Sequence, residues 1–149
     1  MLFRSHALYL FALVRAGSTE AAQWADSPDF APPIEHRAGL IGALASVVPL
    51  SHYSGPGAAK HLGDAAWITP RTVYHAAMLR QAMGCSPVFP APFATLYASL
   101  DSLAAFILAN EEPVLRFFRS VEGMEEWELR ARFCLSEPAT LEEIGRAHV

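Results

Sequence analysis

The sequence predicts an α+β domain in which a small mixed sheet carries helices packed on one face, as in a ferredoxin-like sandwich. Three observations indicate this class. An apolar run rich in aromatic and branched residues, from His6 to Val14, is typical of a buried strand. Two later segments have apolar residues at helical spacing and begin at residues that cap helices. Strand and helix signals alternate over 149 residues, which is enough chain for one domain with a proper core.

The first part of the chain predicts a loop and a hairpin after the opening strand. Residues 18–33 contain three prolines and predict a loop. Two apolar segments, residues 34–39 and 40–48, flank a turn near Gly39 and predict a β-hairpin. Residues 50–64 are rich in serine, glycine and proline, so we expect them to form a connecting segment.

The clearest helix signal begins at Thr69. Its side chain suits the N-cap, Pro70 fits the first helical position, and Gly84 provides a C-terminal stop. Between these limits one face of the helix carries residues at the spacing i, i+3, i+4 and i+7, which is typical of a face packed on a core. This face consists of His75, Met78, Leu79 and Ala82.

The segment after this helix, residues 87–97, is expected to be an extended strand, either at the edge of the sheet or in irregular pairing. Prolines at positions 87, 90 and 92 lack the N–H group that an interior strand needs for its hydrogen-bond ladder. Its aromatic residues are four positions apart, so a regular strand would place them on one face. They are Phe89, Phe93 and Tyr97. Either the helices or a partner must cover that face.

The last part of the chain predicts a second helix and a further strand. Ser99 suits the N-cap of the helix, and Asn110 or Pro113 is expected to interrupt it. Residues 126–133 alternate polar and apolar side chains, as a half-exposed strand does. We therefore expect an α+β domain over residues 1–133. A polar tail, or the stub of a truncated second domain, is expected over residues 134–149.

The composition indicates a protein that handles other proteins. Apolar residues make up 52% of the chain and charged residues 17%, below the usual quarter, so an exposed apolar patch is expected. The net charge of −4 argues against nucleic acid, which requires a basic face. No apolar run is long enough to insert into a membrane. Cys85 and Cys134 form no CxxC motif, which favours two buried thiols in a reducing cytoplasm.

No motif predicts a catalytic residue, a cofactor or a metal. The histidines at positions 6, 36, 52 and 61 lack the spacing of metal ligands. Neither a nucleophile elbow nor a phosphate-binding loop is present. His75 shares its helix face with Met78, so a hydrogen-bonded core histidine is the favoured interpretation. The alternative is a small enzyme or ligand-binding domain that uses His75 beside the proline-rich segment.

Several stretches resemble the N-terminal domain of the gas vesicle accessory family GvpF/GvpL. HAAML at residues 75–79 and VFPAPFATLY at residues 88–97 are similar to the family's His-x-x-Val-Leu helix and Val-Leu-Pro-Leu-Arg-Phe-Gly-Thr-Val-Phe strand. The stretches at residues 6–16, 35–49 and 123–130 agree in the same order. The chain departs from the family at its Arg-Phe-Gly-Thr motif, which reads Pro92-Phe93-Ala94-Thr95 here. The resemblance also implies a shortened relative, without most of the family's largely helical second domain.

The resemblance implies a role in assembly rather than catalysis. Members of the family bind the small hydrophobic shell protein of gas vesicles, to prevent its aggregation or to nucleate growth of the wall. The implied partners are this shell protein and other gas vesicle accessory proteins, and the implied location is the cytoplasm, at the vesicle. Shielding an apolar subunit is favourable because burial gains about 25 cal/mol per Å². The expected contact residues are Phe89, Phe93, Thr95, Tyr97 and Trp127.

Overall fold

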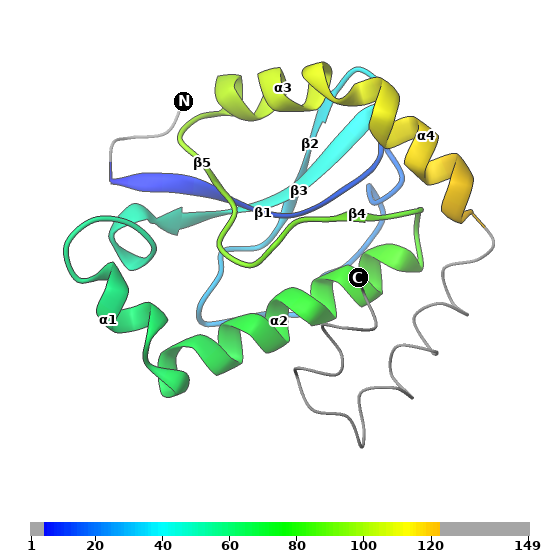
Figure 1. Cartoon of the computed structure of the whole chain (residues 1–149). Helices are drawn as coiled ribbons and strands as arrows, with labels where there is room; N and C mark the ends of the chain where they lie inside the picture. Colours follow the sequence, from blue (N-terminus) through cyan, green and yellow to red (C-terminus); the bar gives the residue numbers. More distant parts are fainter. Residues whose placement is uncertain (1–4, 123–149) are drawn as a thin grey trace, which may run out of the picture.

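The computed structural model describes residues 5–122, which form a five-stranded antiparallel sheet flanked by helices (Figure 1). The strands are β1 (His6–Arg15), β2 (Ile34–Ala38), β3 (Ile41–Pro49), β4 (Phe89–Pro90) and β5 (Leu96–Tyr97). With the 3-10 turn η1 (Leu50–His52), the helices are α1 (Ala58–Leu62), α2 (Ala65–Met83), α3 (Leu100–Ala109) and α4 (Glu111–Val121). The predicted α+β class is confirmed, and the expected mixed sheet is corrected to an antiparallel one.

β1 lies at the centre of the sheet and pairs along both of its edges. β3 runs antiparallel to it on one side, with Arg15 opposite Ile41, and β2 lies outside β3. β4 and β5 pair with the other edge of β1. The predicted hairpin is confirmed as β2 and β3. Its turn contains Gly39, whose φ of 60° suits a residue without a Cβ atom.

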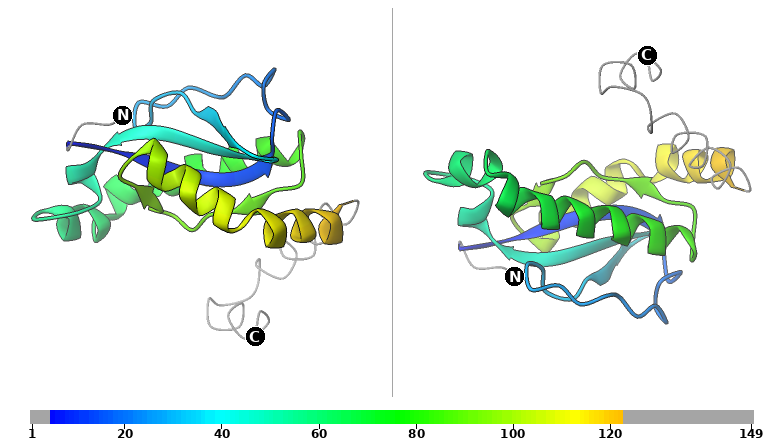
Figure 2. Two further views of the ribbon diagram at one scale, coloured as in Figure 1. Left: turned by 90° about the horizontal axis from the view of Figure 1, so that it is seen from above. Right: turned by 90° about the horizontal axis from the view of Figure 1, so that it is seen from below.

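The helices cover both faces of the sheet, which corrects the expectation that they share one face. Tyr9 and Phe11 of β1 join an apolar cluster with Met78 of α2. Leu8 and Leu10, which alternate with them, pack on the opposite face with residues of α3 and α4. Figure 2 shows α3 and α4 in front of the sheet from one side and α2 in front of it from the other. β1 is apolar at successive positions because both of its faces are buried.

α2 begins earlier than the sequence predicts. Its N-cap is Asp64, whose carboxylate accepts a 3.0 Å hydrogen bond from the backbone N–H of Ala66. Pro70 therefore lies inside the helix and not at its first position, and the predicted cap at Thr69 is wrong. The predicted stop at Gly84 is confirmed as the C-cap. The error arose because Thr-Pro imitates a helix start, whereas the true cap is the aspartate five residues upstream.

α3 and α4 are separated by one residue, Asn110. Ser99 caps α3 as predicted, and its side chain accepts a hydrogen bond from the backbone of Ser102 in a reciprocal capping box. Asn110, one of the two predicted interruptions, ends α3 and precedes α4, whereas Pro113 lies within the first turn of α4. Proline is tolerated there because the first N–H groups of a helix have no partner within the helix.

The proline-rich segment lies at the edge of the described sheet, as predicted. Its pairing is confined to the two short strands β4 and β5, and the chain between them leaves the sheet. Just before it, Cys85 is exposed, so the prediction of a buried thiol is wrong at this position. The predicted strand at residues 126–133, the tail at residues 134–149 and Cys134 all lie outside the described residues.

Candidate partner-binding surfaces

A buried hydrogen-bond network fixes the proline-rich segment against the core. The Tyr9 hydroxyl lies 2.6 Å from Nδ1 of His75, and Nε2 of His75 lies 2.9 Å from the carbonyl oxygen of Ala91. Because a carbonyl can only accept, Nε2 carries the proton and Nδ1 accepts from Tyr9. The Tyr9 oxygen in turn accepts from the N–H of Ala94 at 3.3 Å. Every polar atom of the two side chains therefore has a partner.

The environment of this network favours its uncharged form. Burial lowers the pKa of His75 below its usual value, and the hydrogen bond to Ala91 opposes this only partly. Burial likewise raises the pKa of Tyr9. His75 is 7% exposed and Tyr9 is fully buried. The prediction that His75 is a hydrogen-bonded core histidine is confirmed. Its side chain connects α2 to the edge segment.

The structure does not bring the predicted contact residues onto one face. Phe89 and Tyr97 contact the helices α4 and α3, through Phe117 at a ring distance of 5.2 Å and Phe106 at 5.3 Å. Phe93 packs on the other side, in the cluster around Tyr9. The expectation of a shared face is therefore wrong, because the chain leaves the sheet between β4 and β5 and no longer alternates as a strand does.

The remaining predicted contact residues differ in position. Thr95 closes the turn of the proline-rich segment, because its hydroxyl donates to the carbonyl of Pro92 at 2.7 Å. Its own carbonyl accepts from the N–H of Leu10 at 2.9 Å, which ties the turn to β1. Trp127 lies outside the described residues. Of the aromatic residues predicted to bind a partner, Phe89 is exposed, at 37%, and the described Tyr97 and Phe93 are half-buried.

A second surface, which sequence reasoning missed, surrounds β2 at the opposite edge of the sheet. Large apolar residues are exposed here by 38% to 63%, and we call this set the β2 flank. It comprises Ile34, Leu40, Val47, Leu100 and Leu108. Ile34 pairs with Ala45 and so lies diagonally across from Val47, while Leu108 lies beside the hairpin turn at Gly39. The feature of the sequence that could have indicated this surface is the absence of proline from β2.

A groove of about 560 Å³ lies between β2 and α3 on this flank. Its walls combine apolar residues of α3, including Leu103 and Ile107, with three consecutive polar residues of β2. Those polar residues are Glu35, His36 and Arg37. The carboxylate of Glu35 is held in place by the N–H groups of Gly17 and Thr19, at 2.7 and 3.0 Å. Burial alone would raise the pKa of Glu35, but hydrogen bonds from the Thr19 hydroxyl, from these two N–H groups and from Arg37 lower it, so the side chain stays charged.

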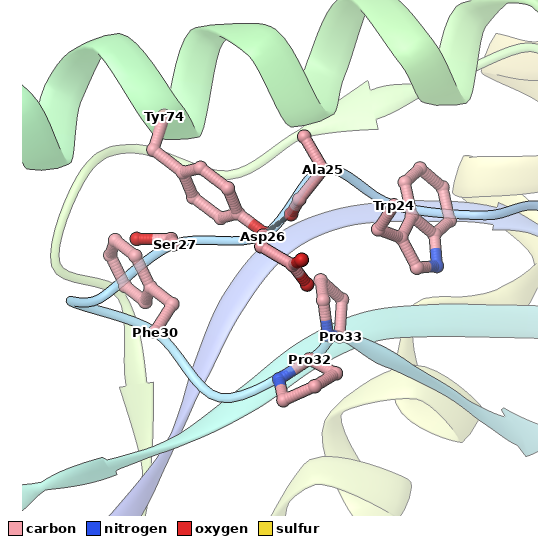
Figure 3. Close-up of a pocket in the computed structure, with 8 residues that line it drawn as sticks. All are labelled: Trp24, Ala25, Asp26, Ser27, Phe30, Pro32, Pro33 and Tyr74. Atoms are coloured by element: carbon pink, nitrogen blue, oxygen red, sulfur yellow. Dashed lines mark hydrogen bonds between the residues drawn. The ribbon is translucent and has the colours of Figure 1, made fainter.

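A smaller pocket of about 80 Å³ lies beneath the loop before β2 (Figure 3). Its lining includes Trp24, Asp26 and the stacked rings of Phe30 and Tyr74, whose centroids are 5.2 Å apart. The Tyr74 hydroxyl donates to the carbonyl of Ala25 at 2.8 Å. Ligand pockets usually enclose roughly 300 to 1,000 Å³. This small pocket therefore acts as a packing feature of the loop.

An aromatic and ionic cluster anchors the start of α2. His61 stacks on Trp67 with ring centroids 4.9 Å apart, and His52 meets the same indole edge-on at 5.9 Å. The Arg71 guanidinium lies over that ring, 3.8 Å from its centroid, and pairs with Asp29 at 3.1 Å. In the part of the chain that the structure describes, no three His, Cys, Asp or Glu side chains gather as metal ligands would. The cluster joins α2 to the loop before β2.

The described residues form a small α+β domain with exposed large apolar side chains near each edge of the sheet. The chain belongs to the GvpL/GvpF family, because residues 7–148 match the family model described as gas vesicle synthesis protein GvpL/GvpF. Its function is therefore related to gas vesicles. No curated protein and no solved structure matches the chain. Within residues 5–122, no helix has both the length and the apolar character needed to cross a membrane.

Proposed function

We propose that this protein is a non-enzymatic gas vesicle assembly factor that binds the hydrophobic shell protein, together with other gas vesicle accessory proteins, in the cytoplasm. The observation that carries the proposal is the family match over residues 7–148. The apolar composition and the exposed large apolar side chains support it, since such surfaces mark protein partners. Binding would prevent aggregation of the shell protein or help the wall to nucleate.

The proposed contact is the outer face of the proline-rich segment, centred on Phe89. This ring is 37% exposed and rests edge-on against Phe117 of α4, so a partner would complete the burial of an aromatic pair. The prolines of this edge lack N–H groups, which favours contact through apolar side chains over a continuous backbone ladder. Thr95 and Tyr97 belong to the same proposed surface, whereas Phe93 supports it from the core side. Trp127, outside the described residues, is proposed as a further contact residue.

A pull-down tests the proposal. The full chain is co-expressed with the shell protein of the same organism, and the shell protein recovered with it is measured. We expect recovery with the natural sequence and at least a fivefold loss with Phe89→Asp. Val73→Asp is the matched control, because Val73 is 60% exposed on α2. Circular dichroism establishes that both variants remain folded.

Two outcomes would contradict the proposal at different levels. If the natural chain recovered no shell protein, the proposed function would be rejected. If Phe89→Asp and Val73→Asp both recovered as much shell protein as the natural chain does, the proposed function would stand and the contact at Phe89 would be rejected.

A further inference from the structure

β2 is an edge strand that neither a proline nor a bulge blocks, although it carries the charges of Glu35 and Arg37. It ends the sheet among the described residues, and its five residues, Ile34–Ala38, contain no proline and no lysine. Natural edge strands are commonly blocked by proline, a bulge or inward-facing charges, because unpaired N–H and C=O groups otherwise recruit another strand. The other edge of this sheet has such protection in its prolines. The outer edge of β2 is therefore the better template for strand addition.

We propose that β2 pairs with β2 of a second copy of this chain, antiparallel about a twofold axis at His36, to form a symmetric dimer. In this register His36 lies opposite His36 of the second copy. Ile34 then lies opposite Ala38, and Glu35 opposite Arg37, in both directions. A single sheet continues from one copy into the other.

The charges of β2 select this register over its neighbours. Glu35 and Arg37 lie on the same face of β2, where Arg37, 47% exposed, donates to the 7% exposed carboxylate of Glu35 in its own strand at 2.9 Å. Arg37 also pairs with Glu20 at 3.4 Å. With the axis at His36, each carboxylate faces a guanidinium of the other copy, which stabilises a cross-strand pair. An axis at residue 35 would oppose two glutamates, and an axis at residue 37 would oppose two arginines. Both alternatives place like charges directly opposite each other.

The apolar side chains support the same contact. Ile34 and Ala38 lie on the face that α3 covers, because their partners in β3, Ala45 and Ile41, belong to the core cluster of that face. Ile34 is 58% exposed and Leu100 of α3 is 40% exposed. Strand pairing brings these side chains of the two copies together on one side of the joined sheet. Burial of the β2 flank then adds apolar stabilisation to the backbone hydrogen bonds.

A second copy suits this edge better than an unrelated strand. The alternation of one acid and one base around a central residue makes the strand complementary to itself, which is the requirement of a twofold interface. Such an interface also closes on itself, so each copy uses its open edge once and no fibre results. The inference is independent of the proposed function, because Phe89 lies at the opposite edge of the sheet.

Sedimentation velocity of the full chain measures the association directly. We expect a concentration-dependent species of about twice the 16.2 kDa chain mass. Arg37→Glu should raise the dissociation constant of the dimer at least tenfold. The new carboxylate would lie opposite Glu35 of the other copy on each side of the axis. The matched control is Arg116→Glu, which changes a 66% exposed arginine of α4 and should leave the association unchanged. Circular dichroism establishes that both variants are folded.

Oxidative cross-linking tests the register. In a chain with Cys85 and Cys134 replaced by alanine, His36→Cys should form a disulfide-linked dimer, because directly opposite residues lie within disulfide reach. Ala38→Cys, which keeps both charges, should not, since residue 38 faces residue 34 of the other copy. A natural chain that stays monomeric at all concentrations would overturn the proposal, as would equal association of Arg37→Glu and the natural chain. Cross-linking at residue 38 in preference to residue 36 would overturn the register.

Discussion

The hydroxyl of Tyr9 donates to Nδ1 of His75 across 2.6 Å, and this contact joins the central strand to the helix that covers it. The same imidazole donates to Ala91, so one side chain links β1, α2 and the proline-rich edge. The edge segment itself bonds to β1 in the short strands β4 and β5 and through two more backbone hydrogen bonds, from Ala91 to Phe11 at 3.0 Å and from Leu10 to Thr95 at 2.9 Å. Its position therefore depends on this hydrogen-bond network together with its short pairings with β1.

Removal of the Tyr9 hydroxyl should destabilise the fold. Tyr9→Phe leaves the buried Nδ1 of His75 and the N–H of Ala94 without their partner, and an unsatisfied buried polar group costs about 1–3 kcal/mol. Denaturant unfolding measures this loss. The control is Tyr97→Phe, at a half-buried position, where a change below about 0.5 kcal/mol is expected. Equal effects of the two substitutions would contradict the role assigned to the network.

The stability of the protein should fall as the pH drops below 6.5. Burial lowers the pKa of His75 in the folded chain, so between this lowered pKa and 6.5 the unfolded chain binds more protons. The contribution of His75 to the free energy of unfolding therefore has its full value above pH 6.5. It decreases as the pH falls from 6.5 to the lowered pKa of His75 in the folded chain. Unfolding curves between pH 7.5 and 5 measure the slope. His75→Gln should reduce that slope, although His36 and His52 add to it in the same direction.

Glycine at position 94 should stabilise the protein. Ala94 has a φ of 65°, a left-handed conformation that costs an alanine roughly 1–2 kcal/mol. Ala94→Gly removes this strain but gives the unfolded chain more freedom, so the expected net gain is about 0.5–1 kcal/mol. Ala91→Gly, in the same segment, has no such strain to relieve and should destabilise. Thermal unfolding of the two variants compares them, and a loss of stability in Ala94→Gly would refute the prediction.

The buried ion pair of α2 should matter far more than an exposed one. Arg71 is 8% exposed, pairs with Asp29 at 3.1 Å and covers the Trp67 ring. Arg71→Ala leaves the Asp29 carboxylate partly buried without its partner, for which a loss of about 3 kcal/mol or more is expected. Arg116→Ala breaks the exposed pair with Glu112 and should cost under about 0.5 kcal/mol. Similar losses of unfolding free energy in the two variants would contradict the larger stabilisation expected from the buried pair of Arg71.

Local patterns in the sequence predict the elements better than they predict how the elements pack. β1, the hairpin and the break at Asn110 follow from apolar runs, a glycine turn and capping residues, which act over a few positions. The distribution of α2 and α3 between the two faces depends on tertiary packing. The sequence did contain a hint of it, because an apolar run without alternation is typical of a strand buried on both faces.

The candidate surfaces were only partly predictable. Phe89 is exposed at an edge strand as the prolines indicate, whereas the reversed direction of Phe93 depends on the backbone between β4 and β5. The positive φ of Ala94 belongs to that stretch, and an alanine gives no sequence signal for it. The β2 flank was missed because Ile34 and Leu108 are far apart in the sequence and only the folded chain places both beside the hairpin.

The two-sided pairing of β1 has a consequence for synthesis of the chain on the ribosome. β1 emerges before the other described strands, yet among the described residues one of its edges pairs only with residues 89–97. At a usual rate of 5–20 residues per second, that edge and the apolar side chains beside it stay open for several seconds. The nascent chain is thus itself an aggregation-prone client until its proline-rich segment has been made, and chaperone occupancy on ribosomes stalled before and after residue 97 should differ accordingly.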